Sequence, residues 1–196
     1  VERYQQLGVD CFHGQARLLS GHEVAVDKQV LTARRIILAT GATPVVPDLP
    51  GLEEVDYYTS GTIWALRRQP RRLIVVGGGP IGCELSQAFN RLGCQVVQVV
   101  HGDRLLKKED AAVSELVAQV FADEGIELYF NCGLERVRRQ DEGLVLTCRD
   151  GEQLRDIPGD ALLFAVGRKP VTQGLGLEEL GVAVDHTGAL VADGTL

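Results

Sequence analysis

The spacing of apolar residues predicts strands and helices in alternation along the middle of the chain. The short apolar run Leu73–Val76 is typical of a strand buried on both faces. Residues 80–92 carry apolar side chains at helical spacing, and Gly93 follows as a helix end: Ile81, Leu85, Ala88, Phe89 and Leu92. The run 95–100 then predicts a second strand.

The same pattern continues to residue 167. A second helix is expected from Asp110 to Gly125, with one apolar face: Val113, Leu116, Val117, Val120 and Phe121. Strands are expected over 126–130 and 160–167, and residues 134–139 and 143–150 form an expected antiparallel pair. This order predicts an α/β fold, a Rossmann-like domain whose parallel sheet carries an antiparallel insert.

The flanking segments predict mostly strands and turns. Three short strands are expected over 11–19, 22–27 and 34–40, the last with a continuously apolar run buried on both faces. Prolines at 44, 47 and 50 indicate a linker without regular structure over 40–51. A short capped helix from Thr59 or Ser60 to about Arg68, and a hairpin over 182–193, complete the expected elements.

Composition narrows the functional classes. The net charge of −7 argues against nucleic acid or an anionic membrane as the main partner. No apolar run reaches the roughly 18 residues of a membrane span, and no signal peptide opens the chain, so we expect a cytoplasmic protein. The five cysteines lack CxxC or CxxxxC spacing, and we assign them neither a catalytic nor a metal-binding role. Because the sequence contains no methionine, we expect a fragment of a longer protein.

One glycine motif carries candidate chemistry. Gly77-Gly78-Gly79-Pro80-Ile81-Gly82 fits GxGxxG between an expected strand and an expected helix. In such motifs the first glycine permits a tight turn, the second lets backbone approach a pyrophosphate, and the third lets helix and strand pack closely. The N-terminus of the helix then attracts phosphate. The alternative is a glycine-rich turn that binds nothing.

The residues after the second strand indicate which dinucleotide is held. NAD-binding domains usually place an acid there for the ribose 2′-hydroxyl, but this chain has basic residues instead: His101, Arg104, Lys107 and Lys108. Basic side chains suit the 2′-phosphate of NADP. The pattern therefore favours NADPH over NADH, and a solvated charged loop is the alternative.

Three segments together carry a family resemblance. ATGATPVVPDLPG (39–51), VVGGGPIGCE (75–84) and LLFAVGRKP (162–170) resemble the pyridine nucleotide-disulphide oxidoreductases, which include dihydrolipoamide dehydrogenase, glutathione reductase, mercuric reductase and soluble transhydrogenase. The resemblance implies an NAD(P)-binding domain at 48–167, inserted between parts of an FAD-binding domain at 1–47 and 168–196.

The resemblance also implies site residues. FAD would contact Ala16, Thr40 and Gly41. Glu84 would lie near the nicotinamide and the flavin, although an acid favoured by the helix dipole is the alternative. Val137 would touch the adenine side of the nicotinamide nucleotide, and the strand end Ala165, Val166 and Gly167 would lie beneath the nicotinamide.

The chain also departs from the family pattern. The family's FAD-binding glycine motif, redox CxxxxC, later GD motif and dimerisation domain are absent from this sequence. Val171 replaces the usual asparagine, and Pro80 stands where glutathione reductase has a tyrosine. The loop RLLKKED (104–110) is most similar to mercuric reductases and soluble transhydrogenase.

The implied activity is hydride transfer from NAD(P)H to FAD and on to a disulphide-type or metal acceptor. The parent enzyme would be a homodimer, and the remaining FAD and dimerisation domains would be partners of this chain, which alone would be inactive. One alternative is a related flavoprotein without a redox disulphide, such as an NADH oxidase or ferredoxin reductase. A non-catalytic NADH sensor is another.

Overall fold

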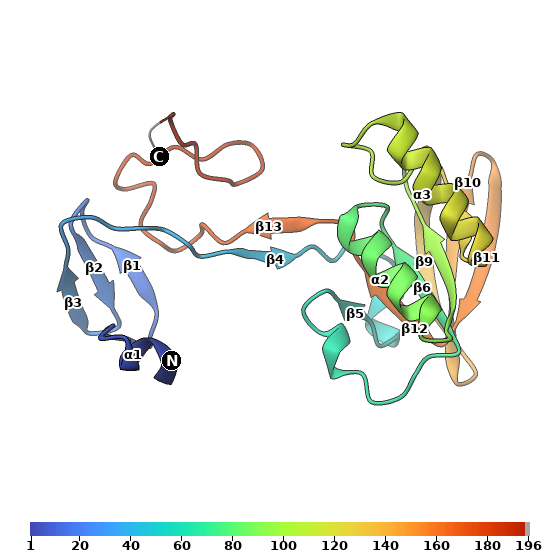
Figure 1. Cartoon of the computed structure of the whole chain (residues 1–196), viewed down its shortest axis with the longest axis horizontal. Helices are drawn as coiled ribbons and strands as arrows, with labels where there is room; N and C mark the ends of the chain where they lie inside the picture. The colour runs from blue at the N-terminus through green and yellow to red at the C-terminus, as the bar shows by residue number, and fades with distance from the viewer. Residues whose placement is uncertain (195–196) are drawn as a thin grey trace. The chain divides into compact units, whose positions relative to one another are not determined.

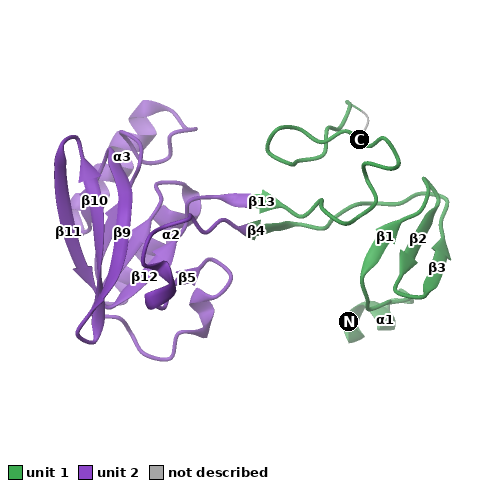
Figure 2. Ribbon diagram, turned by 180° about the vertical axis from the view of Figure 1, so that it is seen from behind, with its two compact units in different colours: residues 1–43, 169–196 green, residues 44–168 purple. Residues whose placement is uncertain are grey.

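The computed structural model describes residues 1–194 and divides the chain into two compact units (Figure 2). Unit 1 comprises Val1–Thr43 and the chain from Lys169 onward, and unit 2 comprises Pro44–Arg168. The divisions fall within β4 (Ala42–Pro44) and β13 (Arg168–Pro170), which pair in a two-stranded sheet. The expectation of an irregular linker over 40–51 is therefore wrong at β4, because a distant segment supplies its hydrogen-bonding partner.

Unit 2 is built on a parallel sheet of five strands in the order β5-β12-β6-β7-β8. Its strands are short, and all four pairings are parallel: β5 (Tyr58–Thr59), β6 (Arg72–Val76), β7 (Gln95–Val99), β8 (Glu127–Tyr129) and β12 (Ala161–Phe164). The helices α2 (Pro80–Arg91) and α3 (Ala111–Asp123) connect β6 to β7 and β7 to β8. This arrangement confirms the predicted α/β fold class.

The sheet of unit 2 has a different cover on each face (Figure 1). Leu73 and Val75 of β6 pack in one core cluster with α2 and α3. Ile74 and Val76 pack in a second cluster with an antiparallel meander of β9 (Cys132–Gln140), β10 (Gly143–Asp150) and β11 (Gln153–Gly159). Both faces of the sheet are therefore shielded from water, which explains the continuous apolar runs of its strands.

The meander has one strand more than the predicted antiparallel pair. β11 pairs with β10 from Leu144↔Gly159 to Asp150↔Gln153. Its sequence, QLRDIPG, contains charges and Pro158 and does not alternate between apolar and polar residues. The strand therefore forms because β10 offers a free edge, and its own residues do not predict it.

The helices bury narrower faces than expected. In α2 the residues Ala88 and Leu92 are exposed, and Ser86 is fully buried against the sheet. In α3 the buried residues are Ser114 and Phe121, whereas Leu116 is 65% exposed. Small side chains let a helix approach a sheet closely, and a hydrophobic pattern alone does not show which part of an apolar stripe meets the sheet.

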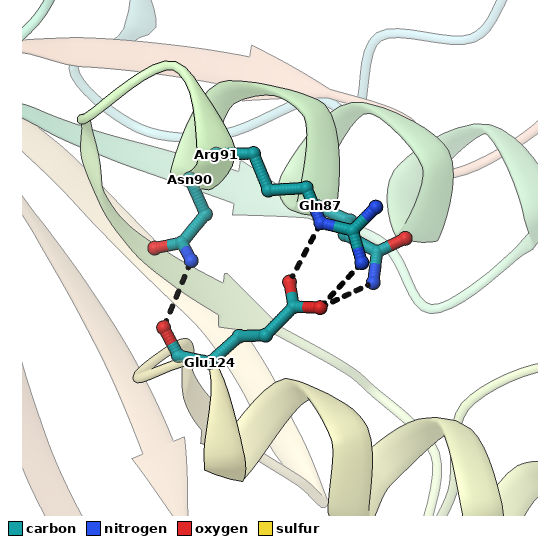
Figure 3. A network of polar contacts seen from close by, with 4 residues as sticks. All are labelled: Gln87, Asn90, Arg91 and Glu124. Atoms are coloured by element: carbon teal, nitrogen blue, oxygen red, sulfur yellow. Dashed lines mark hydrogen bonds and ion pairs between the residues drawn. The ribbon is translucent and has the colours of Figure 1, made fainter.

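A polar network joins the C-terminal ends of the two helices (Figure 3). Glu124 follows α3, and its carboxylate accepts hydrogen bonds from Gln87 Nε2 at 3.0 Å and Arg91 Nε at 3.2 Å. Asn90 Nδ2 donates to the Glu124 carbonyl oxygen at 2.9 Å. The Arg91 guanidinium lowers the pKa of Glu124 below that of an ordinary glutamate.

We expect Glu124→Gln to lower the free energy of unfolding at pH 7. We also expect this free energy to change less in the variant than in the unmodified chain as the pH falls. Since the folded-state pKa of Glu124 is lowered, its contribution is present above the unfolded-state pKa and is lost as the pH falls through the folded-state value. Urea denaturation from pH 7 down to about pH 3 measures this. Glu115→Gln, on the exposed side of α3, is the matched control. Equal pH profiles for Glu124→Gln and the unmodified chain would contradict the expectation.

One short 3₁₀ turn in unit 2 replaces an expected helix. The chain forms η2 (Ile63–Ala65) where a helix from Thr59 or Ser60 to Arg68 was predicted, and a further 3₁₀ turn, η1 (Leu52–Glu54), precedes this segment. Thr59 belongs to β5 instead, and its N–H donates to Thr62 Oγ1 at 2.9 Å. Pairing of β5 with β12 therefore overrides the local helix signal.

Unit 1 contains a short helix, α1 (Glu2–Gln6), and an antiparallel sheet of β1 (Ala16–Leu18), β2 (Glu23–Val26) and β3 (Gln29–Thr32). The third strand is therefore β3 and not the predicted 34–40. Among the described residues no strand pairs with 36–39, and Ile37 is 90% exposed. A strand needs a neighbouring strand for its hydrogen bonds, so the apolar run alone does not form one.

The predicted hairpin over 182–193 is reduced to a bridge between Val184 and Leu190. Asp185 closes its turn, since Oδ1 accepts hydrogen bonds from the backbone N–H groups of Thr187 and Ala189. None of the helices in the described part of the chain is long and apolar enough to cross a membrane.

Candidate nucleotide-binding site

The glycine motif forms the turn between β6 and α2. Gly77 has φ +125°, and its N–H donates to the Val99 carbonyl at 2.8 Å. A Cβ atom added at Gly77 would lie 2.3 Å from the Ala165 carbonyl oxygen, and one added at Gly82 would lie 2.3 Å from the Gly77 carbonyl oxygen. Backbone contacts therefore require glycine at both positions.

Gly79 differs from these two glycines. Its φ of −80° suits any residue, and an added Cβ would have no described atom within 4 Å. Gly79 is the N-cap of α2, and among the described residues no side chain caps this helix. The first turn of α2 thus presents N–H groups and the positive end of the helix dipole to open space, an arrangement that attracts phosphate.

A cavity of about 640 Å³ lies in front of this turn, wholly within unit 2. The carboxyl ends of β6, β7 and β12 form its base, which is the edge at which open α/β sheets generally bind ligands. Most of the predicted dinucleotide contacts line it: Gly77, Gly78, Gly79, Pro80, Ile81, His101, Arg104, Lys107, Ala165, Val166 and Gly167. Gly82 lies behind the turn, where it gives α2 its close approach to Gly77.

The basic loop after β7 is fixed over the glycine turn. Leu106 has φ +48°, and its N–H donates to the Gly78 carbonyl at 2.7 Å. The Arg104 guanidinium donates to the Lys107 carbonyl at 3.0 Å. Four basic residues and one acidic residue, Glu109, line this side of the cavity. The loop therefore presents an excess of positive charge next to the helix N-terminus.

A buried amide supports the turn from below. Gln98, in the middle of β7, is fully buried, and its Nε2 donates to the Gly77 carbonyl at 2.8 Å. Gln98 belongs to no motif of the sequence, and its only signal is a polar residue within an apolar run. Gly77 is thus held by Val99 on its N–H and by Gln98 on its carbonyl.

Three residues predicted near the dinucleotide lie outside the cavity lining: Gly82, Glu84 and Val137. Val137 is 2% exposed and packs in the core beneath the meander, where its N–H donates to the Pro50 carbonyl. Cys132 and Leu134, which the sequence analysis did not predict, form the cavity wall on that strand instead. The contact of Val137 with the dinucleotide therefore stays a prediction.

Glu84 lies on the exposed side of α2 and lines a second groove of about 350 Å³ between α2 and α3. Cys83 lines the same groove and donates its thiol hydrogen to the Gly78 carbonyl at 3.7 Å. Burial raises the pKa of Cys83, so its thiol is a packing group near the turn and not a nucleophile.

The three residues expected to contact FAD belong to unit 1. Ala16 is in β1 opposite Val26. Thr40 Oγ1 donates to the Val171 carbonyl at 2.6 Å, and the Gly41 carbonyl accepts from the Val171 N–H at 3.0 Å. None of the three lines either cavity of unit 2.

Known proteins share both the sequence and the fold. The family profile described as pyridine nucleotide-disulphide oxidoreductase matches residues 1–196. A mercuric reductase from Bacillus cereus is 36% identical over 196 residues, which cover 98% of this chain and 31% of that protein. A glutathione reductase from Nostoc sp. is 34% identical over 180 residues, 92% of this chain and 39% of that protein.

Among solved structures, the HOCl-induced flavoprotein disulfide reductase RclA from Escherichia coli matches with a TM-score of 0.84 and 29% identity, over 98% of this chain and 45% of that chain. The chain thus spans less than half the length of these relatives. Since the family profile covers every residue, the chain belongs to the pyridine nucleotide-disulphide oxidoreductases, a family of flavin-dependent oxidoreductases.

Proposed function

We propose that unit 2 is the NAD(P)H-binding domain of an FAD-dependent oxidoreductase and that it favours NADPH. The main observation in support of this proposal is the open space at Gly79, before the uncapped N-terminus of α2, inside a cavity of about 640 Å³. The geometry fits a dinucleotide, because backbone N–H groups face the space where a pyrophosphate would lie. A glycine turn without a ligand would not need that space.

In this proposal, different residues of the cavity bind different parts of the dinucleotide. Gly79 leaves room for the phosphates, Gly78 leaves room for the Val100 side chain behind the turn, and the basic loop supplies charge for a 2′-phosphate. The strand end Ala165–Gly167 forms the wall for the nicotinamide half. When bound, NAD(P)H supplies a hydride that the flavin of the full-length enzyme accepts.

The acceptor of the full-length enzyme is proposed to be a disulphide or a metal ion. The names of the relatives, mercuric reductase and glutathione reductase, support these two classes. We further propose that unit 1 belongs to the FAD-binding domain and that more of that domain covers the exposed run around Ile37. An NADH oxidase-like enzyme without a redox disulphide is the alternative.

Isothermal titration of the 196-residue chain tests the proposal. We expect NADPH to bind with a dissociation constant above about 1 µM, since unit 2 supplies only one wall of the nicotinamide site. NADH is expected to bind at least about tenfold more weakly, because it lacks the 2′-phosphate. Failure of both nucleotides to bind at about 5 mM would refute the proposed function. Equal affinities would refute only the preference for NADPH.

A further inference from the structure

Two buried thiols lie on the neighbouring strands β9 and β10 of the meander, and one of them, Cys132, lines the nucleotide cavity. Cys132 opens β9 and Cys148 lies in β10; both are free thiols, 1% and 0% exposed, in the same core cluster. Neither has a role in the proposed binding of NAD(P)H. They are therefore a pair of soft donor atoms whose use is unassigned.

The two thiols interact directly. Burial, and hydrogen bonding with Cys132, raise the pKa of Cys148 to about 12. Cys148 accordingly keeps its proton at neutral pH in the absence of a ligand. A ligand that displaces this proton must form a strong bond to sulfur.

Cys132 connects the pair to the cavity. It lines the cavity together with Leu134, and its N–H donates to the Val100 carbonyl at 3.1 Å. The preceding residue, Asn131, donates to the Gly102 carbonyl at 2.8 Å, next to the basic loop. Cys132 is thus the member of the pair that borders the cavity, with only 1% of its surface exposed.

The strand register favours a bridged pair over a disulfide. Cys132 is opposite Asp150 and Cys148 is opposite Leu134, so the two cysteines occupy diagonal positions on one face of the β9–β10 ladder. Diagonal Cα atoms are about 7–8 Å apart, beyond the roughly 6.8 Å limit of ordinary disulfides. Two metal–sulfur bonds of about 2.3 Å each span about 4.6 Å between sulfurs and suit this spacing.

We propose that Cys132 and Cys148 form a two-thiolate site for a thiophilic divalent cation. Among residues 1–194 no group of three His, Cys, Asp or Glu side chains is placed to hold a metal, so the site suits a cation that accepts two ligands. Each thiol loses one proton, two metal–sulfur bonds form, and nothing is oxidised or reduced. The product is electrically neutral, which matters because an unpaired charge in this core would be costly.

The location predicts competition with the dinucleotide. A cation held by Cys132 changes the wall of the cavity, so cation and NADPH should weaken each other's binding by the same factor. This second part rests on the proposed function, whereas the cation site does not.

Mercuric ion is the probe for the cation site. The full chain is loaded with Hg²⁺ and dialysed against iodide, which removes metal from single thiols. We expect the unmodified chain and the control Cys94→Ser, another buried cysteine of unit 2, to retain one Hg²⁺ per chain. Cys132→Ser and Cys148→Ser should retain less than about a tenth of that. Retention by either of these variants equal to the control would overturn the site.

Proton release gives a measurement that needs no variant. With the unmodified chain, the tightly bound Hg²⁺ should release two protons, and release of one would overturn a two-thiolate site. A second titration then compares NADPH affinity with and without Hg²⁺. We expect a loss of at least about tenfold in the unmodified chain and none in Cys132→Ser.

The two proposals fail separately. Unchanged NADPH affinity in the loaded protein would overturn the competition and leave the cation site standing. Absence of NADPH binding to the metal-free chain would overturn the proposed function, while Hg²⁺ retention would still decide the cation site.

Discussion

Gly82→Ala is expected to lower the free energy of unfolding of unit 2 by about 3 kcal/mol, whereas Gly79→Ala should change it by less than about 1 kcal/mol. The two substitutions add the same methyl group three residues apart. At Gly82 the new Cβ would lie 2.3 Å from the Gly77 carbonyl oxygen, so α2 must move away from the turn. At Gly79 it would meet no described atom within 4 Å.

The affinity for NADPH should distinguish these two variants in the opposite sense, with the specific loss of binding at Gly79. Gly79→Ala places its methyl group in the space before the helix N-terminus, so we expect a folded protein whose NADPH affinity falls at least about tenfold. Urea denaturation and calorimetric titration of both variants measure the contrast. A Gly79→Ala protein that binds NADPH as well as the unmodified chain would show that the phosphates do not lie at this turn.

Sequence alone was sufficient where the signal is local. The strand β6, the glycine turn and the helix α2 each have their cause within a few residues, such as the run Leu73–Val76 and the positive φ of Gly77. The α/β fold class follows from the order of such elements. Every predicted residue of the glycine turn except Gly82 lines the cavity.

Elements that depend on a distant partner could not be predicted. β11 forms on the edge of β10 in spite of Pro158, and β4 forms only because β13 pairs with it. The apolar run at Ile37 shows the converse, because it has strong strand propensity but no paired strand among the described residues. Hydrogen-bonding partners far along the chain decide these cases.

The same limit applies to the candidate site. Cys132 reaches the cavity only because the meander folds over the sheet, and Gln98 reaches Gly77 only because β7 lies beside β6. Val137 lies five residues after Cys132 on the same strand. Its own side chain is buried in the core and does not reach the cavity. A linear motif identifies the residues that touch a ligand from the motif itself, but not those that tertiary packing brings to it.

Neutralising the basic loop is expected to abolish the preference for NADPH. The double variant Lys107→Gln, Lys108→Gln removes two charges from the cavity wall, and Arg104→Gln removes the guanidinium that also braces the loop through the Lys107 carbonyl. A hydrogen bond to a charged group contributes about 1.5–3 kcal/mol, so NADPH affinity should fall about ten- to hundredfold in each variant. NADH affinity should change by less than about threefold, because the two nucleotides differ only at the 2′-phosphate.

The comparison of the two nucleotides separates a phosphate site from a solvated loop. Arg68→Gln removes an exposed positive charge outside the cavity and controls for net charge. Affinity for NADPH in the unmodified chain should also fall steeply with added salt, since partly exposed charges are screened within about 10 Å at 0.1 M ionic strength. If the loop is only a solvated charged surface, both nucleotides will weaken equally and slightly in the loop variants and in Arg68→Gln. In that case the position of the basic residues over the glycine turn would have no role in choosing the cofactor.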